Sequence, residues 1–159
     1  DNVLEKNKDV MSAVSSAIHH VGKDPGMGQT VKACLQSLIG GVYSATFETC
    51  ALAAKAGIEG QVLYDVVGTS VVGCLATRNS IQKIIDREFI GTGSHIDTMY
   101  KDLTISLDMA RGLGVPMSIA SMAMQLFQAG KTKHPEGDCW IVTKVIEDIV
   151  GAELHRAER

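Results

Sequence analysis

Aromatic side chains are scarce in this sequence of 159 residues: one tryptophan, three tyrosines and three phenylalanines make up 4% of the chain. Proline is also rare, with three residues, whereas glycine occurs sixteen times and 45% of the residues are hydrophobic. Aromatic residues favour strands, so their scarcity beside many small residues indicates closely packed helices rather than a β-sandwich. The length is that of one ordinary domain, and the apolar content excludes a disordered chain.

The sequence also has no excess of basic residues. Fifteen lysines and arginines stand against eighteen acidic residues, which gives a net charge of −3. This balance argues against a protein that binds nucleic acid or an anionic membrane surface. The charge-free stretch 112–130 approaches the ~20 residues of a membrane-spanning helix. It contains glycine, proline, serine and glutamine, however, so we expect a buried helix of a soluble protein and no membrane partner.

The four cysteines are far apart and include no C-x-x-C pair: Cys34, Cys50, Cys74 and Cys139. In a chain of this size the pattern predicts free thiols rather than a disulfide framework. The histidines show no metal-ligand spacing either, so we expect no metal site. The charged first residues exclude a signal peptide at this end, and we expect a cytoplasmic protein.

Hydrophobic periodicity predicts helices over 3–16, 28–56, 61–67, 71–85, 96–112, 117–129 and 139–153. The second helix would be about 40 Å long, a length typical of the spine of a domain or of a dimer interface. Residues 17–22 predict a short strand before a turn that contains Pro25. Beyond Gly151 the charged tail is expected to fray.

A helix followed by a strand and a turn is typical of the end of an α/β domain. A lone strand is not stable by itself, and the sequence does not begin with methionine. We therefore expect 1–25 to be the remnant of a preceding domain and 26–159 to be an all-α domain.

Gly26 and Gly28 lie where the predicted strand leads into the long helix. Glycines at such a junction let a backbone approach a dinucleotide pyrophosphate. The third glycine of that fingerprint is replaced by Val31, and no second strand follows, so this is not a Rossmann loop. Two interpretations remain open: a turn that only starts a helix, or a close approach to a ligand.

Lys32 and Gln36 share one helix face because they are four residues apart. A partly desolvated lysine can exchange a proton with a substrate oxygen, although a solvated surface lysine has the same spacing. Glu48, inside an apolar stretch, predicts an ion pair. Lys101 and Asp102 could hold a phosphate or a ribose, or form a solvated first turn.

The order of these features resembles the β-hydroxyacid dehydrogenase family. The resemblance lies in the segment from His20 to Lys32, the long helix with Glu48, the Tyr-Lys-Asp-Leu element at 100–103 and Leu-Gly-Val-Pro at 113–116. It extends over nearly the whole chain. It implies the all-α, 6-phosphogluconate dehydrogenase C-terminal-like helical domain, preceded by the last helix and strand of a Rossmann domain. Members of the family include 3-hydroxyisobutyrate, tartronate-semialdehyde and threonate dehydrogenases.

The resemblance implies that Lys32 is the general acid/base in hydride transfer between NAD or NADP and a small β-hydroxyacid. The cofactor would be bound mainly by an N-terminal Rossmann domain, so this chain alone would be inactive. A homodimer or homotetramer is implied. The other implied contacts are substrate-binding Gln36 and Gly28, and cofactor-binding Lys101, Asp102 and Gly26.

Two positions depart from the family pattern. Family members commonly have asparagine at the third and fourth positions after the lysine, where this sequence has Leu35 and Gln36. Gln36 can still donate to a substrate carboxylate or hydroxyl, but Leu35 cannot. Either the substrate differs from hydroxyisobutyrate, or activity has been lost. The alternative function is a non-catalytic helical dimerisation or interaction domain of the same fold.

Overall fold

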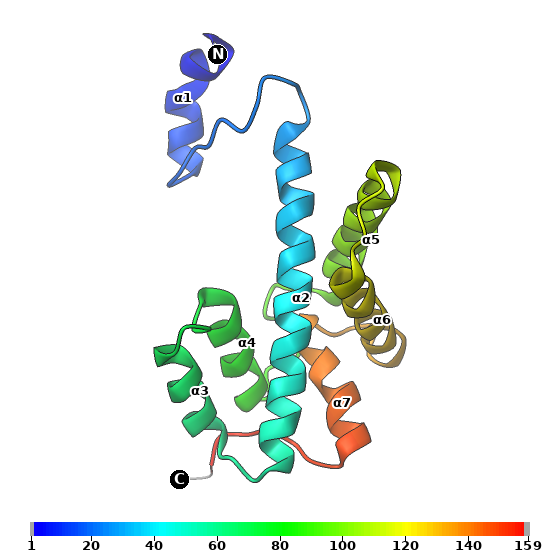
Figure 1. Cartoon of the computed structure of the whole chain (residues 1–159). Helices are drawn as coiled ribbons and strands as arrows, with labels where there is room; N and C mark the ends of the chain where they lie inside the picture. Colours follow the sequence, from blue (N-terminus) through cyan, green and yellow to red (C-terminus); the bar gives the residue numbers. More distant parts are fainter. Residues whose placement is uncertain (1, 158–159) are drawn as a thin grey trace.

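The computed structural model describes residues 2–157, in which the regular structure is helical (Figure 1). The elements are α1 (Asn2–Val14), α2 (Met27–Lys55), α3 (Gly60–Thr69), α4 (Leu75–Ile85), α5 (Ile96–Leu113), α6 (Ser118–Lys133), a 3-10 turn η1 (Cys139–Ile141) and α7 (Val142–Val150). The all-α prediction is confirmed. The strand predicted at 17–22 is wrong: these residues are irregular, because the described chain offers no second strand to pair with them.

Helix α2, of 29 residues, is the spine of the molecule. In Figure 1, α3 and α4 lie on one side of its lower half, and α5, α6 and α7 lie on the other. Most of the few aromatic residues meet against it: Phe47 of α2 is fully buried, with ring centroids of Tyr43 and Phe127 each 6.1 Å away. Trp140 packs edge-on against Tyr43 at 5.3 Å. The scarce aromatics therefore form the centre of one core.

Glycine in the middle of α2 lets α5 approach closely. A Cβ atom at Gly40 would lie 2.7 Å from Cδ2 of Leu103, which is fully buried on α5. Two turns towards the start of α2, the buried Ser106 hydroxyl lies 2.8 Å from the carbonyl oxygens of both Ala33 and Asp102. These contacts set the register of α5 against the first half of α2.

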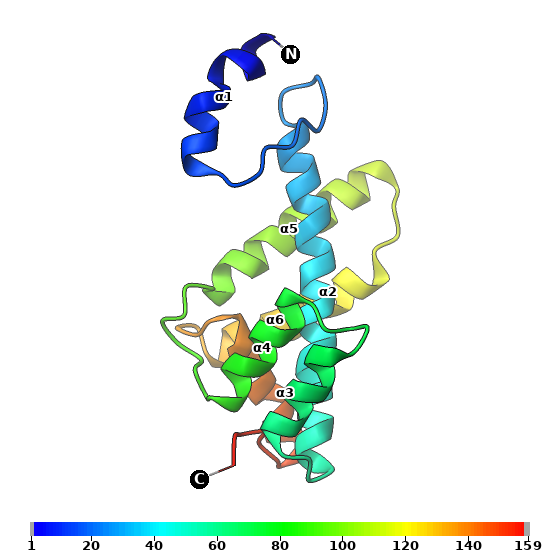
Figure 2. The same cartoon turned by 90° about the vertical axis from the view of Figure 1, so that its left-hand side faces the viewer.

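The first helix lies apart from this body. Helix α1 buries none of its residues, and Figures 1 and 2 show it above and beside the upper end of α2. The connection ends at Gly26, which has a positive φ of 96° and whose carbonyl accepts the first hydrogen bonds of α2. A left-handed residue at this point favours glycine, which supports the helix-starting interpretation.

The C-terminal tail is ordered through residue 157, so the expectation that it frays is wrong for these residues. Leu154 is only 2% exposed. Buried Glu147 accepts two hydrogen bonds from Arg87, at 2.7 and 2.9 Å, and one from the Leu154 backbone at 3.2 Å. A buried carboxylate must be paired with hydrogen-bond donors. Because one of these donors is the Leu154 backbone, the pairing attaches the tail to the helices.

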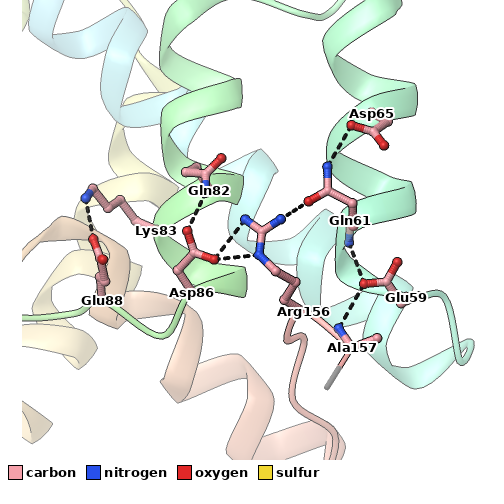
Figure 3. Close-up of polar contacts among 9 residues, drawn as sticks. All are labelled: Glu59, Gln61, Asp65, Gln82, Lys83, Asp86, Glu88, Arg156 and Ala157. Carbon is pink, nitrogen blue, oxygen red and sulfur yellow. Dashed lines mark hydrogen bonds and ion pairs between the residues drawn. The ribbon is translucent and has the colours of Figure 1, made fainter. Parts of the chain in front are cut away.

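Further along the tail, Arg156 lies between α3 and α4 (Figure 3). Its guanidinium donates to Asp86 at 2.8 Å and to the side-chain oxygen of Gln61. The Ala157 backbone donates to Glu59 at 3.0 Å. The hydrogen bond from Arg156 is the main reason why the pKa of Asp86 lies below its ordinary value of 3.8.

The structure also tests the expectations for Glu48, for the cysteines and for a membrane-spanning helix. Glu48 is exposed and forms no ion pair within residues 2–157, so the predicted pair is wrong. All four cysteines are free thiols, and burial raises the pKa of Cys50 to about 12 and that of Cys139 to about 11. Among the described residues, no helix is both long and apolar enough to span a bilayer.

Gly40→Val tests the close approach of α5. The added methyl groups would overlap the buried Leu103 side chain, and overpacking of this kind costs about 1–3 kcal/mol of unfolding free energy. Gly112→Ala on α5 is the matched control, because its Cβ meets no atom within 4 Å and alanine favours a helix. Urea unfolding of the two variants measures the difference. Equal stability would show that the contact at Gly40 does not limit helix packing.

Arg156→Met tests the tail contact through its pH dependence. Because the pKa of Asp86 is lower in the folded chain than in the unfolded chain, ionised Asp86 stabilises the fold above about pH 4. That stabilisation is lost as the pH falls through the lowered pKa. We expect the variant to melt a few degrees below the wild type at pH 7, and the difference to shrink as the pH falls below about 4 and through the lowered pKa of Asp86. Thermal melts across this range measure it, and a constant difference would contradict the Asp86 contribution.

Candidate active site

The residues singled out on two distant segments lie together where α5 crosses the first half of α2. Lys32 and Gln36 project from α2, and Lys101 and Asp102 from the second turn of α5. All four line one hollow of about 100 Å³, together with Gln29, Ala33 and Ile105. Sequence reasoning singled out these side chains as candidates, and the tertiary structure brings the four of them together.

Asp102 is the centre of this cluster. Its side chain is 5% exposed. Lys101 Nζ lies 2.7 Å from Oδ1, Gln36 Nε2 donates to Oδ2 at 2.5 Å, and Lys32 Nζ lies 3.9 Å from Oδ2. Burial pushes the pKa of Asp102 upward, but the hydrogen bonds from Lys101 and Gln36 and the charges of both lysines outweigh it. The pKa therefore lies below its ordinary value, and the carboxylate is ionised at neutral pH.

The cluster carries a net positive charge, because two ammonium groups face one carboxylate. The Lys32 and Lys101 side chains are 54% and 58% exposed, so their remaining N–H groups are open to a ligand. The nearby N-terminus of α2 adds the partial positive charge of the helix dipole. Together these charges suit a small anion such as a carboxylate.

The glycines at the start of α2 lie outside the hollow, unlike the two lysines. Gly26 and Gly28 are both exposed at the start of α2 and do not line the hollow. Gln29, one turn before Ala33, does line it, although sequence reasoning did not identify this residue. Leu35 is 52% exposed and is also absent from the lining, so the apolar side chain at that position does not fill the hollow.

Ser106 is a second residue that sequence reasoning missed. Its hydroxyl connects α5 to the Ala33 carbonyl of α2, directly beside the hollow. The one available signal was its position four residues after Asp102, on the same helix face. Among residues 2–157 no three His, Cys, Asp or Glu side chains gather as a metal site would require.

Comparison with known proteins decides the family. Residues 26–146 match the family model described as NAD-binding of NADP-dependent 3-hydroxyisobutyrate dehydrogenase. The chain belongs to the 3-hydroxyisobutyrate dehydrogenase family. The resemblance inferred from the sequence motifs is thereby confirmed.

Relatives in this family extend well beyond the length of the chain. L-threonate dehydrogenase of Escherichia coli K12 is 33% identical over 150 residues, 94% of this chain and 49% of its own length. 2-(Hydroxymethyl)glutarate dehydrogenase of Eubacterium barkeri is 29% identical over 153 residues, 96% of this chain and 50% of its own. The chain therefore spans about half the length of the curated relatives that it matches.

A solved structure confirms the helical domain. The crystal structure of a 3-hydroxyisobutyrate dehydrogenase from Salmonella typhimurium matches with a TM-score of 0.84 at 33% identity. The match covers 89% of this chain and 50% of that chain. The arrangement of helices around α2 is therefore the family's helical fold.

Proposed function

We propose that this chain is the substrate and dimerisation domain of an NAD- or NADP-dependent dehydrogenase of small β-hydroxyacids, with Lys32 as general acid/base. The observation that carries the proposal is the convergence of Lys32, Gln36, Lys101 and Asp102 on one hollow, in a chain of this family. The named relatives support the substrate class, since threonate and 2-(hydroxymethyl)glutarate are both hydroxy acids.

Lys32 is placed to serve the reacting oxygen. In reduction its ammonium donates a hydrogen bond and then a proton to the substrate carbonyl oxygen, and in oxidation its neutral amine accepts the hydroxyl proton. A positive charge already held beside the developing alkoxide stabilises it without reorganisation. Asp102 orients this ammonium from behind, 3.9 Å away, while the free side of Lys32 faces the ligand.

The size of the hollow separates substrate from cofactor. About 100 Å³ suits a small hydroxy acid, whereas sites for larger ligands span about 300–1,000 Å³. When bound, NAD or NADP supplies the hydride donor or acceptor. We assign most of its binding to a Rossmann domain beyond 26–159, of which 1–25 would be the last part, and only edge contacts to Lys101 and Gly26. Both oxygens of Asp102 already accept hydrogen bonds, so its contribution to the cofactor is indirect. The chain 1–159 alone is expected to show no turnover.

Lys32→Ala tests the catalytic assignment in the intact enzyme, in which this chain is joined to its cofactor domain. Loss of general acid/base catalysis should lower kcat by about 10²–10⁴-fold, while the affinity for the nicotinamide cofactor changes little. Lys55→Ala, at the opposite end of α2, is the matched control. Steady-state kinetics and cofactor titration measure both quantities. Unchanged turnover in Lys32→Ala would remove Lys32 from the mechanism and leave the non-catalytic interaction domain as the better function.

Self-association is the second part of the proposal, and it rests on the face of α2 turned away from the core. An apolar strip with alternating spacings of three and four residues follows this face, the spacing by which helices pair. No charged residue lies between Lys32 and Glu48. We call this the α2 seam; it consists of Val31, Leu35, Leu38, Val42, Ala45, Thr49 and Leu52. Leu38 is 65% exposed and Leu52 71% exposed, so the periodicity that predicted α2 marks its open face more than its core.

Two apolar hollows flank the middle of the α2 seam, and Val42 and Ala45 line both. One, of about 440 Å³, extends towards α3 and α4, and the other, of about 540 Å³, towards the start of α6. Exposed apolar side chains border this surface, among them Val71 and Val72 before α4 and Ile119 of α6. A stable interface buries roughly 800 Å² of such surface on each side. A second copy suits it, because a two-fold contact between uncharged strips brings no like charges together.

Leu38→Glu tests the α2 seam. A carboxylate in the middle of the strip would be desolvated and unpaired in the assembly, so the mass in solution should fall to that of the monomer. Ile149→Glu on α7, where the isoleucine is 79% exposed, is the matched control and should leave the mass unchanged. Size-exclusion chromatography with light scattering measures the masses. A monomeric wild type at micromolar concentration would overturn the assembly.

A further inference from the structure

A second polar hollow lies apart from the candidate active site. It has a volume of about 630 Å³ and lies between the α4–α5 connection, the α6–η1 connection and the first turn of α7. It shares no lining residue with the hollow at Lys32 or with the two along the α2 seam. Sites for small organic ligands span about 300–1,000 Å³, so this one is large enough for a ligand of its own. We call it the α4–α7 hollow; its lining includes Lys83, Phe89, Ile90, His134, Ile141 and Lys144.

Hydrogen bonds hold the two connections together. Buried Asp138 accepts from the backbone N–H of Thr92 at 2.6 Å and from the Thr92 hydroxyl at 2.7 Å. The Asp138 backbone donates to the Phe89 carbonyl at 2.8 Å, and the Trp140 indole donates to the Thr92 hydroxyl, also at 2.8 Å. The walls of the hollow are therefore fixed in advance, which lowers the entropy cost of binding a ligand there.

Most of the positive charge in the α4–α7 hollow is already neutralised. Lys83 pairs with Glu88, which it faces in Figure 3. The Arg87 guanidinium lies 2.7 Å from the buried carboxylate of Glu147. Lys144 is only partly exposed, yet within residues 2–157 no carboxylate lies within ion-pair distance of its ammonium group. Lys144 therefore supplies a positive charge that is available to a ligand.

Two hydrogen-bonding groups of the hollow lack partners within residues 2–157. The Lys144 ammonium lies over the Phe89 ring, 5.4 Å from its centroid, and donates no hydrogen bond. Nε2 of His134 is buried and has no hydrogen-bond partner either. Buried polar atoms are normally paired, and a neutral imidazole with its proton on Nε2 donates from that atom. Both groups therefore suit an anionic oxygen.

We propose that the α4–α7 hollow binds an organic acid with an apolar body. The carboxylate lies at Lys144 and His134, whose two donors match its two oxygens. The apolar body lies against Ile90 and Ile141. Because Ile90 is 60% exposed, covering it removes a large hydrophobic surface from water. This site goes beyond the proposed function, since none of its residues takes part in the chemistry at Lys32.

Glu136 contributes a negative charge to the same hollow. It is exposed and forms no ion pair within the described chain. Its carboxylate repels an acid and attracts a cation, although salt and water weaken both effects. Replacement of Glu136 and replacement of Lys144 should therefore change the affinity for an acid in opposite directions.

The experiment measures the affinity of the intact enzyme for 3-phenylpropanoate by calorimetry. The uncharged analogue 3-phenylpropan-1-ol should bind at least about tenfold more weakly, and Lys144→Met should weaken binding of the acid by about 10- to 100-fold. Glu136→Gln should strengthen it by about two- to threefold. Lys131→Met is the matched control and should leave the affinity unchanged, because Lys131 also lies over a ring, that of Tyr100, but does not line the hollow.

Isoleucine methyl NMR locates the bound acid, because each hollow has an isoleucine of its own. Ile90 and Ile141 line the α4–α7 hollow, Ile105 lines the candidate active site, and Ile81 and Ile119 line the two hollows along the α2 seam. Saturable shifts at Ile90 and Ile141 support the proposal. Shifts confined to Ile105, or to Ile81 and Ile119, place the acid elsewhere and overturn it.

The affinities themselves give further ways to overturn the proposal. Absence of saturable binding of 3-phenylpropanoate would do so, as would equal affinity for the alcohol. An unchanged affinity in Lys144→Met, shown to be folded by thermal melting, would remove the carboxylate from that lysine. Tighter binding of phenyl phosphate than of 3-phenylpropanoate would contradict the assignment of a carboxylate. None of these results bears on Lys32, so the proposed function is tested separately.

Discussion

The contact between α2 and α5 is the constraint on which the rest of the structure depends. Gly40 has no side chain where Leu103 needs room, so the two helices approach closely enough for the Ser106 hydroxyl to reach the Ala33 carbonyl. One turn before Ser106 on α5, the same approach brings Asp102 within reach of Gln36. The hollow is therefore a consequence of helix packing, and its side chains are held by rigid elements rather than by loops.

Burying Asp102 makes this site both costly and well ordered. A carboxylate removed from water must be paired, and here it is paired three times, with Lys101, Gln36 and Lys32. Pairing with Asp102 lowers the conformational entropy of the three partner side chains. Their remaining hydrogen-bonding groups therefore point in defined directions. The site therefore presents fixed charges on rigid helices.

Much of the fold follows from local pattern. The predicted helix 28–56 is α2 at Met27–Lys55, because apolar periodicity and the glycine start are local signals. The predictions that were wrong share one cause: each feature depends on residues that are distant in the sequence. The strand at 17–22 lacks a neighbour to pair with, and the charged tail is held by Glu147, Asp86 and Gln61, which the local sequence cannot reveal. Glu48 is a charge without a partner within the described chain, although its apolar surroundings in the sequence predicted one.

By itself the sequence determined the all-α class, the long central helix, the family motifs and the polar residues worth examining, since each depends on neighbours a few positions away. Only the tertiary structure decided that Gln36 and Asp102, 66 positions apart, form one hydrogen bond, and that Leu35 lies outside the hollow. Those properties depend on how closely two helices pack and which faces they turn to each other, and residue spacing along one chain carries no measure of that distance.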